Sequence, residues 1–219
     1  MITGLLDLPV TLDLFYDPNK NFALFMEQSV FSGQMIGGSD FGVFLIIYSL
    51  VTWLYYRYKR SNNQMTSSNF LEKYRFIVVT GVLSTVLAVH SLKLLISRAR
   101  PNLYFRELMN APEYSHDYWL PGIEGIFGPK GYSWNSLPSG HSSTSAIFIT
   151  MAYLLSSNSK SSKILPAFVF LSVLLYTMLM GVARSMSGMH WLSDSVASFF
   201  IVWTVTDAVW RKFRSNIVS

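Results

Sequence analysis

The chain has 219 residues, of which 51% are hydrophobic, 16% are aromatic and only 13% are charged. In soluble domains about a quarter of the residues are charged, so this composition excludes an ordinary water-soluble globule and favours an integral membrane protein. Disordered and collagen-like chains are excluded as well, because apolar residues are abundant while Gly (13) and Pro (8) are ordinary in number.

Charge and cysteine content narrow the chemistry further. The 17 Lys and Arg residues outnumber the 12 Asp and Glu residues, which is one mark of nucleic-acid binding. We expect no nucleic-acid partner, because the basic residues gather in the loops of a membrane chain. The chain has no cysteine, so disulfides, thiolate nucleophiles and zinc–thiolate sites are excluded.

Five apolar segments are expected to cross the bilayer as helices. They cover residues 41–56, 76–96, 141–155, 164–182 and 192–210. A straight span needs about 20 mostly apolar residues, so the first and third are expected to extend into their flanks. The segment 21–37 contains Glu27 and Gln34 and is interpreted as an amphipathic interfacial helix, with a tilted sixth span as the alternative. We therefore predict an all-α, polytopic membrane helix bundle, a single domain over 1–219 with an N-terminal interfacial segment over 1–40.

Basic residues gather in three segments that the five-span arrangement places on one side of the membrane. These are 57–75, with five basic residues against one acid, the 156–163 loop and the C-terminal tail. The positive-inside rule makes that side cytoplasmic. The 97–137 loop and the 183–191 turn then lie outside. We expect a multi-pass cell-membrane protein, interpreted as one of the bacterial inner membrane, with its site on the periplasmic or extracellular side.

The second span ends in the sequence KLLISRARP, residues 93–101. Lys93 and Arg100 are seven positions apart, so on a helix their side chains point the same way. Pro101 disfavours helix at Arg100 and predicts the end of the helix there. Two cations on one face can bind a dianion; the alternative is that both simply reach for water at the end of the span. Arg98 is expected to face away from Arg100.

The third span opens with PSGH, residues 138–141. Ser139 and Gly140 place free backbone N–H groups at a helix start, where the helix dipole also favours an anion. His141, in the first turn, could donate a proton to a bound anion or accept one from it. The alternative is a capped helix start with an incidental histidine.

The fourth span runs into ARSMSGMHWLSD, residues 183–194. If His190 begins the fifth helix, Asp194 lies one turn further on the same face, where it can fix the imidazole tautomer. Gly188 would allow a sharp turn before it. The alternative is a histidine at a helix start with a surface aspartate, but a carboxylate in the first turn of an apolar span favours a functional role. Arg184 precedes this pair.

Two further features have simpler interpretations. His90, three residues before Lys93, is expected to make a packed polar contact inside the bundle. The 97–137 loop is too long for a plain connector and is expected to cover or flank the site.

Together the three motifs favour a site over coincidence. Two His, three cations, a helix start and an Asp fall at the same external face. Cations combined with backbone N–H groups bind an anion with several oxygens, most simply a phosphate. The outer face carries no carboxylate cluster with metal-ligand spacing, and the chain has no Walker-type loop. We therefore expect a reaction without metal or cofactor, and no nucleotide hydrolysis.

The same residues can be given roles in phosphoryl transfer. With Asp194 behind it, His190 can attack phosphorus and form a phospho-histidine. His141 can protonate the departing alkoxide and then activate the water that hydrolyses the intermediate. The cations that would stabilise the developing charge are Lys93, Arg100 and Arg184.

These motifs resemble a known signature. K-x6-RP (93–101), PSGH (138–141) and R-x5-H-x3-D (184–194) resemble the three-part signature of the type-2 phosphatidic acid phosphatase family, which is related to the vanadium haloperoxidases. The resemblance implies a membrane protein, usually of six helices, that acts on lipid phosphates without metal. Where the family often has Ser before the third-motif Arg, this chain has Ala183, which implies one hydrogen bond fewer to phosphate.

The resemblance also implies residue roles. His190 is the implied nucleophile, Asp194 its orienting partner and His141 the general acid and base. The implied phosphate ligands are Lys93, Arg100, Ser139, Gly140 and Arg184.

The leading interpretation is a lipid-phosphate phosphatase that hydrolyses a phosphomonoester or pyrophosphate of a membrane lipid at the outer face. Candidate substrates are phosphatidate, phosphatidylglycerophosphate, polyprenyl (di)phosphate and lipid A phosphates, which the motifs do not separate because they contact only the phosphate. One alternative is a phosphotransferase that passes the phosphoryl group to a lipid or sugar hydroxyl. A non-catalytic binding or transport protein is disfavoured by the His190–Asp194 spacing, and a haloperoxidase by the membrane composition. The sequence carries no signal for oligomeric state.

Overall fold

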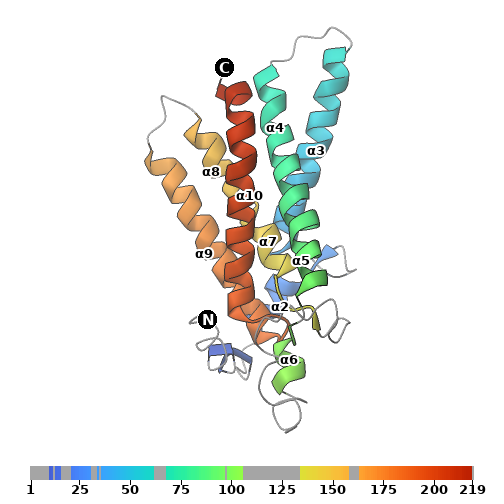
Figure 1. The fold of residues 1–219 in the computed structure, drawn as a ribbon, viewed down its shortest axis with the longest axis vertical. Helices are drawn as coiled ribbons and strands as arrows, with labels where there is room; N and C mark the ends of the chain where they lie inside the picture. Colours follow the sequence, from blue (N-terminus) through green and yellow to red (C-terminus); the bar gives the residue numbers. More distant parts are fainter. Residues whose placement is uncertain are drawn as a thin grey trace.

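The computed structural model describes an all-helical bundle in which α10 occupies the centre (Figure 1). The described residues are 10–11, 13–15, 21–30, 34, 36–61, 68–96, 98–105, 134–157 and 163–218. The helices within them are α2 (Asn21–Glu27), α3 (Asp40–Ser61), α4 (Ser68–Gly81), the π-helix η2 (Val82–Ala88), α5 (Val89–Leu95), α6 (Pro101–Leu103), α7 (Gly140–Ala146), α8 (Ile149–Ser156), α9 (Ile164–Met186) and α10 (Leu192–Val218). No strand occurs in this part of the chain, so the predicted all-α membrane bundle is confirmed.

Within the described residues, four helical stretches are long and apolar enough to cross a bilayer. They are Asp40–Ser61, Asn69–Leu95, Ile164–Met186 and Leu192–Ile217. Four of the five predicted spans correspond to these stretches, with ends shifted by up to seven residues. Their outward faces carry many exposed Leu, Ile, Val and Phe side chains, as expected for surfaces that meet lipid.

The predicted third span, 141–155, is wrong as a single helix. The structure divides it into α7 and α8, which meet at a turn over Ile147 and Phe148. The hydroxyls of Thr144 and Ser145 both donate to the backbone carbonyl of His141. Hydroxyls that bond back to the preceding turn bend helices, which gives a physical reason for the break.

The second apolar stretch is interrupted differently, by the seven-residue π-helix η2 between α4 and α5. The N–H of Val89 still reaches the carbonyl of Ser84, five residues back, at the end of this segment. Long π-helical runs are rare in proteins, and those that occur often lie at functional sites. The irregularity faces α7, on the side of the bundle where the candidate site lies.

α2 is too short to span a bilayer, which favours the interfacial interpretation of this segment over a sixth span. Its buried Ala23 and Met26 pack against Met180 and Ala183 of α9. Ala183, where the family often has Ser, therefore lies in the apolar contact between these two helices.

The two ends of the bundle are formed by different segments of the chain (Figure 1). The end of α3, the start of α4, the end of α8, the start of α9 and the end of α10 lie at one end, and these elements flank or carry the basic segments found in the sequence. The end of α5, the end of α9 and the starts of α7 and α10 lie at the other end. The three motifs therefore meet at the end opposite the basic one.

Candidate active site

The first motif is held by a backbone pairing rather than by one continuous helix. α5 ends at Leu95, and Arg98 pairs with the segment before α7 through N–H bonds from Arg98 to Trp134 O (2.8 Å) and from Ser136 to Arg98 O (3.1 Å). The predicted span end at residue 96 is therefore close, but the prediction that helix continues as far as Arg100 is wrong. Pro101 instead begins the short helix α6, a position that tolerates its missing N–H.

Lys93 and Arg100 nevertheless meet, because both contact Asn135. Lys93 Nζ donates to the backbone oxygen of Asn135 at 2.9 Å, and Arg100 Nη2 donates to its side-chain oxygen at 3.0 Å. Arg100 is buried and Lys93 is partly buried. One asparagine thus fixes the two cations beside each other. Sequence reasoning missed Asn135, whose only signal was its place three residues before the PSGH motif.

His190 is buried in the turn that precedes α10, so it does not itself begin that helix, which starts at Leu192 as the predicted fifth span does. Its Nδ1 lies 2.5 Å from the backbone oxygen of Ser136 and 3.5 Å from Oδ2 of Asp194. A carbonyl oxygen only accepts, so Nδ1 carries the hydrogen and the neutral ring keeps a lone pair on Nε2. This is the tautomer that a nucleophilic imidazole needs.

The charge state of His190 is set by its surroundings. Burial lowers the pKa of His190 well below its usual value of 6.5, and the charges of Arg184 and Lys93 act in the same direction. The hydrogen bond and charge of Asp194 oppose them. The lowered pKa keeps the imidazole neutral at neutral pH.

Asp194 is fully buried and takes part in more contacts than the sequence indicated. Its carboxylate pairs with the guanidinium of Arg98, accepts from Ser136 Oγ (2.5 Å) and accepts from the N–H of Trp191 (2.9 Å). Arg98, predicted to face away from Arg100, faces Asp194. A buried ion pair of this kind is sensitive to the loss of either partner. Ser136, also missed from the sequence, contacts both His190 and Asp194.

The second motif begins α7 and is tied to α10. Ser139 caps α7 by accepting the N–H of Ser142 at 3.4 Å, and its own N–H donates to the carbonyl of Asp194 at 3.3 Å. An added Cβ on Gly140 would meet no atom within 4 Å, so the start of the helix borders open space. His141 follows, within electrostatic range of Lys93, Arg100 and Arg184.

Arg184, the last predicted phosphate ligand, lies near the end of α9. Its backbone carbonyl accepts the N–H groups of Met189 (3.0 Å) and His190 (3.2 Å), which closes the turn that carries the histidine. Its guanidinium pairs with Glu27 of α2 at 2.7 Å. Glu27 was visible in the sequence only as an acid in an apolar segment. Gly188, in the same turn, has φ +71°, as its predicted role in a sharp bend requires.

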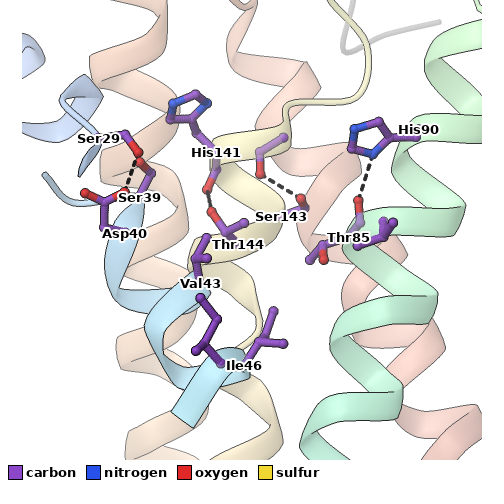
Figure 2. A pocket seen from close by; sticks show the side chains of 13 residues that line it. Ser29, Ser39, Asp40, Val43, Ile46, Thr85, His90, His141, Ser143 and Thr144 are labelled. Atoms are coloured by element: carbon purple, nitrogen blue, oxygen red, sulfur yellow. Dashed lines mark hydrogen bonds between the residues drawn. The ribbon is translucent and has the colours of Figure 1, made fainter. Parts of the chain in front are cut away.

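A cavity of about 450 Å³ lies beside the start of α7, between α3 and the η2–α5 segment (Figure 2). Figure 2 shows Asp40 and Ser29 on one side, His90 on the other and His141 between them in this view. The full lining is Ser29, Ser39, Asp40, Val43, Ile46, Ile47, Thr85, Val86, His90, Gly140, His141, Ser143 and Thr144.

The backbones of α3 and α7 almost touch at this cavity. An added Cβ on Gly42 would lie 1.9 Å from the carbonyl oxygen of Thr144, so only glycine permits the contact. This approach brings the start of α3 beside His141.

The long loop was predicted over 97–137 and was expected to cover or flank the site. Its described part, which includes 134–136, flanks the site. Residues 106–133 lie outside the described residues. Among the described side chains, no group of three or more His, Asp or Glu lies close enough together to hold a metal ion.

The PAP2 superfamily model matches residues 74–217, about two thirds of the chain and a region that contains every predicted site residue. The chain belongs to the PAP2 superfamily. No curated protein and no solved structure matches it. Members of this superfamily are phosphatases, which supports a general phosphoric-ester hydrolase activity for this chain. The four apolar helices among the described residues indicate a membrane protein.

Proposed function

We propose that the protein is a membrane lipid-phosphate phosphatase that works through a phospho-histidine on His190 without a metal ion. The observation that carries the proposal is the contact of His190 Nδ1 with the carbonyl of Ser136, because it leaves Nε2 as the free nucleophilic nitrogen. The buried site keeps that nitrogen unprotonated at neutral pH.

The reaction has two displacement steps. In the first, the lone pair of His190 Nε2 attacks phosphorus and the ester P–O bond breaks. The departing alkoxide takes a proton from the imidazolium form of His141, which the negative charge of the bound phosphate stabilises against the neighbouring cations. In the second, His141 takes a proton from water, the resulting hydroxide attacks phosphorus, the P–N bond breaks, and inorganic phosphate leaves. Asp194 stabilises the positive imidazole of the intermediate.

Fixed cations stabilise the phosphoryl oxygens in both steps. Lys93 and Arg100 are set by Asn135, and Arg184 is set by Glu27. The backbone N–H groups of Gly140 and His141 lack acceptors within their helix, so they add hydrogen-bond donors on another side of the phosphoryl group. Positioned charges of this kind supply most of the catalysis in phosphoryl transfer.

A lipid substrate is supported by the cavity beside His141. It lies between α3 and the Asn69–Leu95 stretch, both of which are able to cross a bilayer, and its lower wall is made of aliphatic side chains. An outer location for the site, periplasmic or extracellular, is supported by the basic segments at the opposite end of the bundle.

Phosphate release from a panel of lipid phosphates, with the detergent-solubilised protein and with EDTA present, tests the proposal. We expect release that survives EDTA and is lost in His190→Ala, with unchanged thermal unfolding of the variant as the control for folding. Loss of release in EDTA would overturn the metal-free mechanism. Consumption of substrate without equal phosphate release would indicate transfer to another hydroxyl instead of hydrolysis.

A further inference from the structure

A second cavity lies at the basic end of the bundle, away from the candidate active site. It has a volume of about 550 Å³ and lies between the end of α3 and the start of α4, which run side by side (Figure 1). That volume is in the range of pockets that bind small organic ligands. Three arginines line this α3–α4 cavity, Arg57 and Arg60 from α3 and Arg75 from α4, against one acid, Glu72. A hollow with this excess of positive charge is suited to an anion.

Aromatic rings hold two of the three guanidinium groups in place. The guanidinium of Arg57 lies over the ring of Trp53, 5.3 Å from its centroid. The guanidinium of Arg75 lies over the ring of Phe213 of α10, at 5.1 Å. Such contacts restrict a long side chain before any ligand arrives, so less entropy is lost when the ligand binds. A guanidinium has five N–H donors, and most of them remain available for oxygen atoms of an anion.

The positive charge of this cavity is compensated only in part. Arg75 pairs with Glu72 at 3.4 Å, so these two charges offset each other. Arg57 and Arg60 form no ion pair with any residue that the structure describes. The sequence that connects α3 to α4, residues 62–67, contains no acid. Two net positive charges therefore remain at the cavity.

The general tendency of cations at the end of a span to reach for water does not account for this arrangement. It accounts for Lys59, Arg211 and Lys212, which lie at the same end of the bundle but outside the cavity. It gives no reason for arginines of two different helices to converge on one hollow. Convergence of this kind is what recognition of a phosphate requires, because several donors must reach the same group of oxygens.

The position of the cavity favours an anion that belongs to the membrane. Both helices that form it are long and apolar enough to cross a bilayer, and the cavity lies near the end of one and the start of the other. That is the level at which lipid headgroups are expected. Trp53 and Leu71 give the cavity an apolar part, and tryptophan is enriched at the membrane–water interface. Basic pockets between spans on the cytoplasmic side are suited to anionic headgroups.

We propose that the α3–α4 cavity binds the phosphate-bearing headgroup of an anionic phospholipid in the leaflet opposite the candidate active site. Arg57 and Arg60 donate to the phosphoryl oxygens, and Arg75 adds further donors beside Glu72. The acyl chains leave the cavity past Trp53 and Leu71. This lipid is bound and not hydrolysed, because no histidine is among the described residues that line the cavity. The inference does not depend on the proposed function.

The test measures binding of phosphatidylglycerol to the full chain in a neutral detergent, by native mass spectrometry. Phosphatidylcholine, whose headgroup has no net charge, is the comparison. We expect phosphatidylglycerol to bind at least about tenfold more tightly than phosphatidylcholine, and Arg57→Gln/Arg60→Gln to weaken its binding by about tenfold. Lys59→Gln/Arg211→Gln removes two charges from the same end but outside the cavity, and should bind phosphatidylglycerol as the wild type does. Lipid held at the candidate active site contributes equally to all these proteins.

Arg57→Lys/Arg60→Lys distinguishes a shaped site from surface charge. It keeps both charges but loses the planar guanidinium groups, so we expect weaker binding of phosphatidylglycerol. Both arginines are exposed, so the variants should unfold at the wild-type temperature when no lipid is added.

Three results would overturn the inference. The first is equal affinity of the wild type for the two lipids. The second is equal affinity of the Gln, Lys and charge-matched control variants for phosphatidylglycerol. The third is binding of inorganic phosphate that depends on Arg57 and Arg60 without binding of phosphatidylglycerol, which would assign the cavity to a free anion.

Discussion

The backbone carbonyl of Ser136 lies 2.5 Å from Nδ1 of His190, although 54 positions separate the two residues in sequence. The hydroxyl of the same serine donates to Asp194, so Ser136 connects the nucleophile and the carboxylate. The orientation of the imidazole therefore does not depend on Asp194 alone.

Asp194→Asn should consequently reduce activity less than loss of an orienting carboxylate usually does. We expect kcat to fall about tenfold to a hundredfold, short of the roughly 10⁴-fold loss seen when an imidazole adopts the wrong tautomer. The variant should lose about 3 to 5 kcal/mol of unfolding free energy, because buried Arg98 loses its charged partner. Steady-state kinetics and thermal unfolding measure the two effects.

Ser136→Ala is the matched control, because it removes the hydroxyl but keeps the carbonyl. It should retain more activity than Asp194→Asn and lose only about 1 to 3 kcal/mol of stability. A folded Asp194→Asn enzyme as inactive as His190→Ala would show that the carbonyl does not hold the ring.

Asn135→Ala separates the two cations of the first motif. The backbone oxygen that accepts from Lys93 remains, whereas the side-chain oxygen that accepts from Arg100 is lost. We expect kcat/KM to fall about tenfold, the equivalent of one charge-assisted hydrogen bond, without a large change in thermal unfolding. A loss of activity in Asn135→Ala as large as that in Lys93→Ala would contradict this role of the Asn135 side chain.

The acid limb of the pH profile should lie below pH 6.5, because burial and the charges of Arg184 and Lys93 lower the pKa of His190 from that value. Neutral His190 is the nucleophile, so kcat/KM stays level as pH falls until the lowered pKa is reached. Arg184→Gln removes a positive neighbour and should move the acid limb to higher pH, in addition to lowering the plateau. A limb that moves to lower pH, or does not move, would contradict this assignment.

Two glycines of the site should respond in opposite ways to alanine. Gly188→Ala places a side chain at φ +71° and 2.5 Å from the ring of Phe15, so we expect a loss of about 1 to 3 kcal/mol of stability together with activity. Gly140→Ala meets no atom within 4 Å and should fold normally, but its methyl group occupies space beside the phosphate site and should lower kcat/KM. Equal melting temperatures for the two variants would contradict the comparison.

Much of the bundle could be predicted from the sequence because the signals are local. Apolar length marks four spans, and the basic segments all fall at one end. The break between α7 and α8 could not be predicted from hydropathy, since it follows from the hydroxyls of Thr144 and Ser145 bonding to His141 O.

The candidate site was predictable in its residue types but not in its supports. Lys93 and Arg100 were expected on one helix face, whereas the structure joins them through Asn135. Asn135 and Ser136 reach the site only because their segment pairs with Arg98, a long-range contact that has no sequence period. Glu27 likewise depends on how α2 packs on α9.

The near contact between α3 and α7 has an evolutionary consequence. α3 precedes the region shared with the superfamily, yet Ser39 and Val43 form one wall of the cavity whose opposite wall belongs to that region. The residues proposed to bind phosphate and this wall of the cavity thus lie in separate stretches of the sequence. We expect substitutions in the first stretch to alter the shape of this wall without touching the proposed phosphate ligands, provided that Gly42 stays glycine so that α3 and α7 can approach.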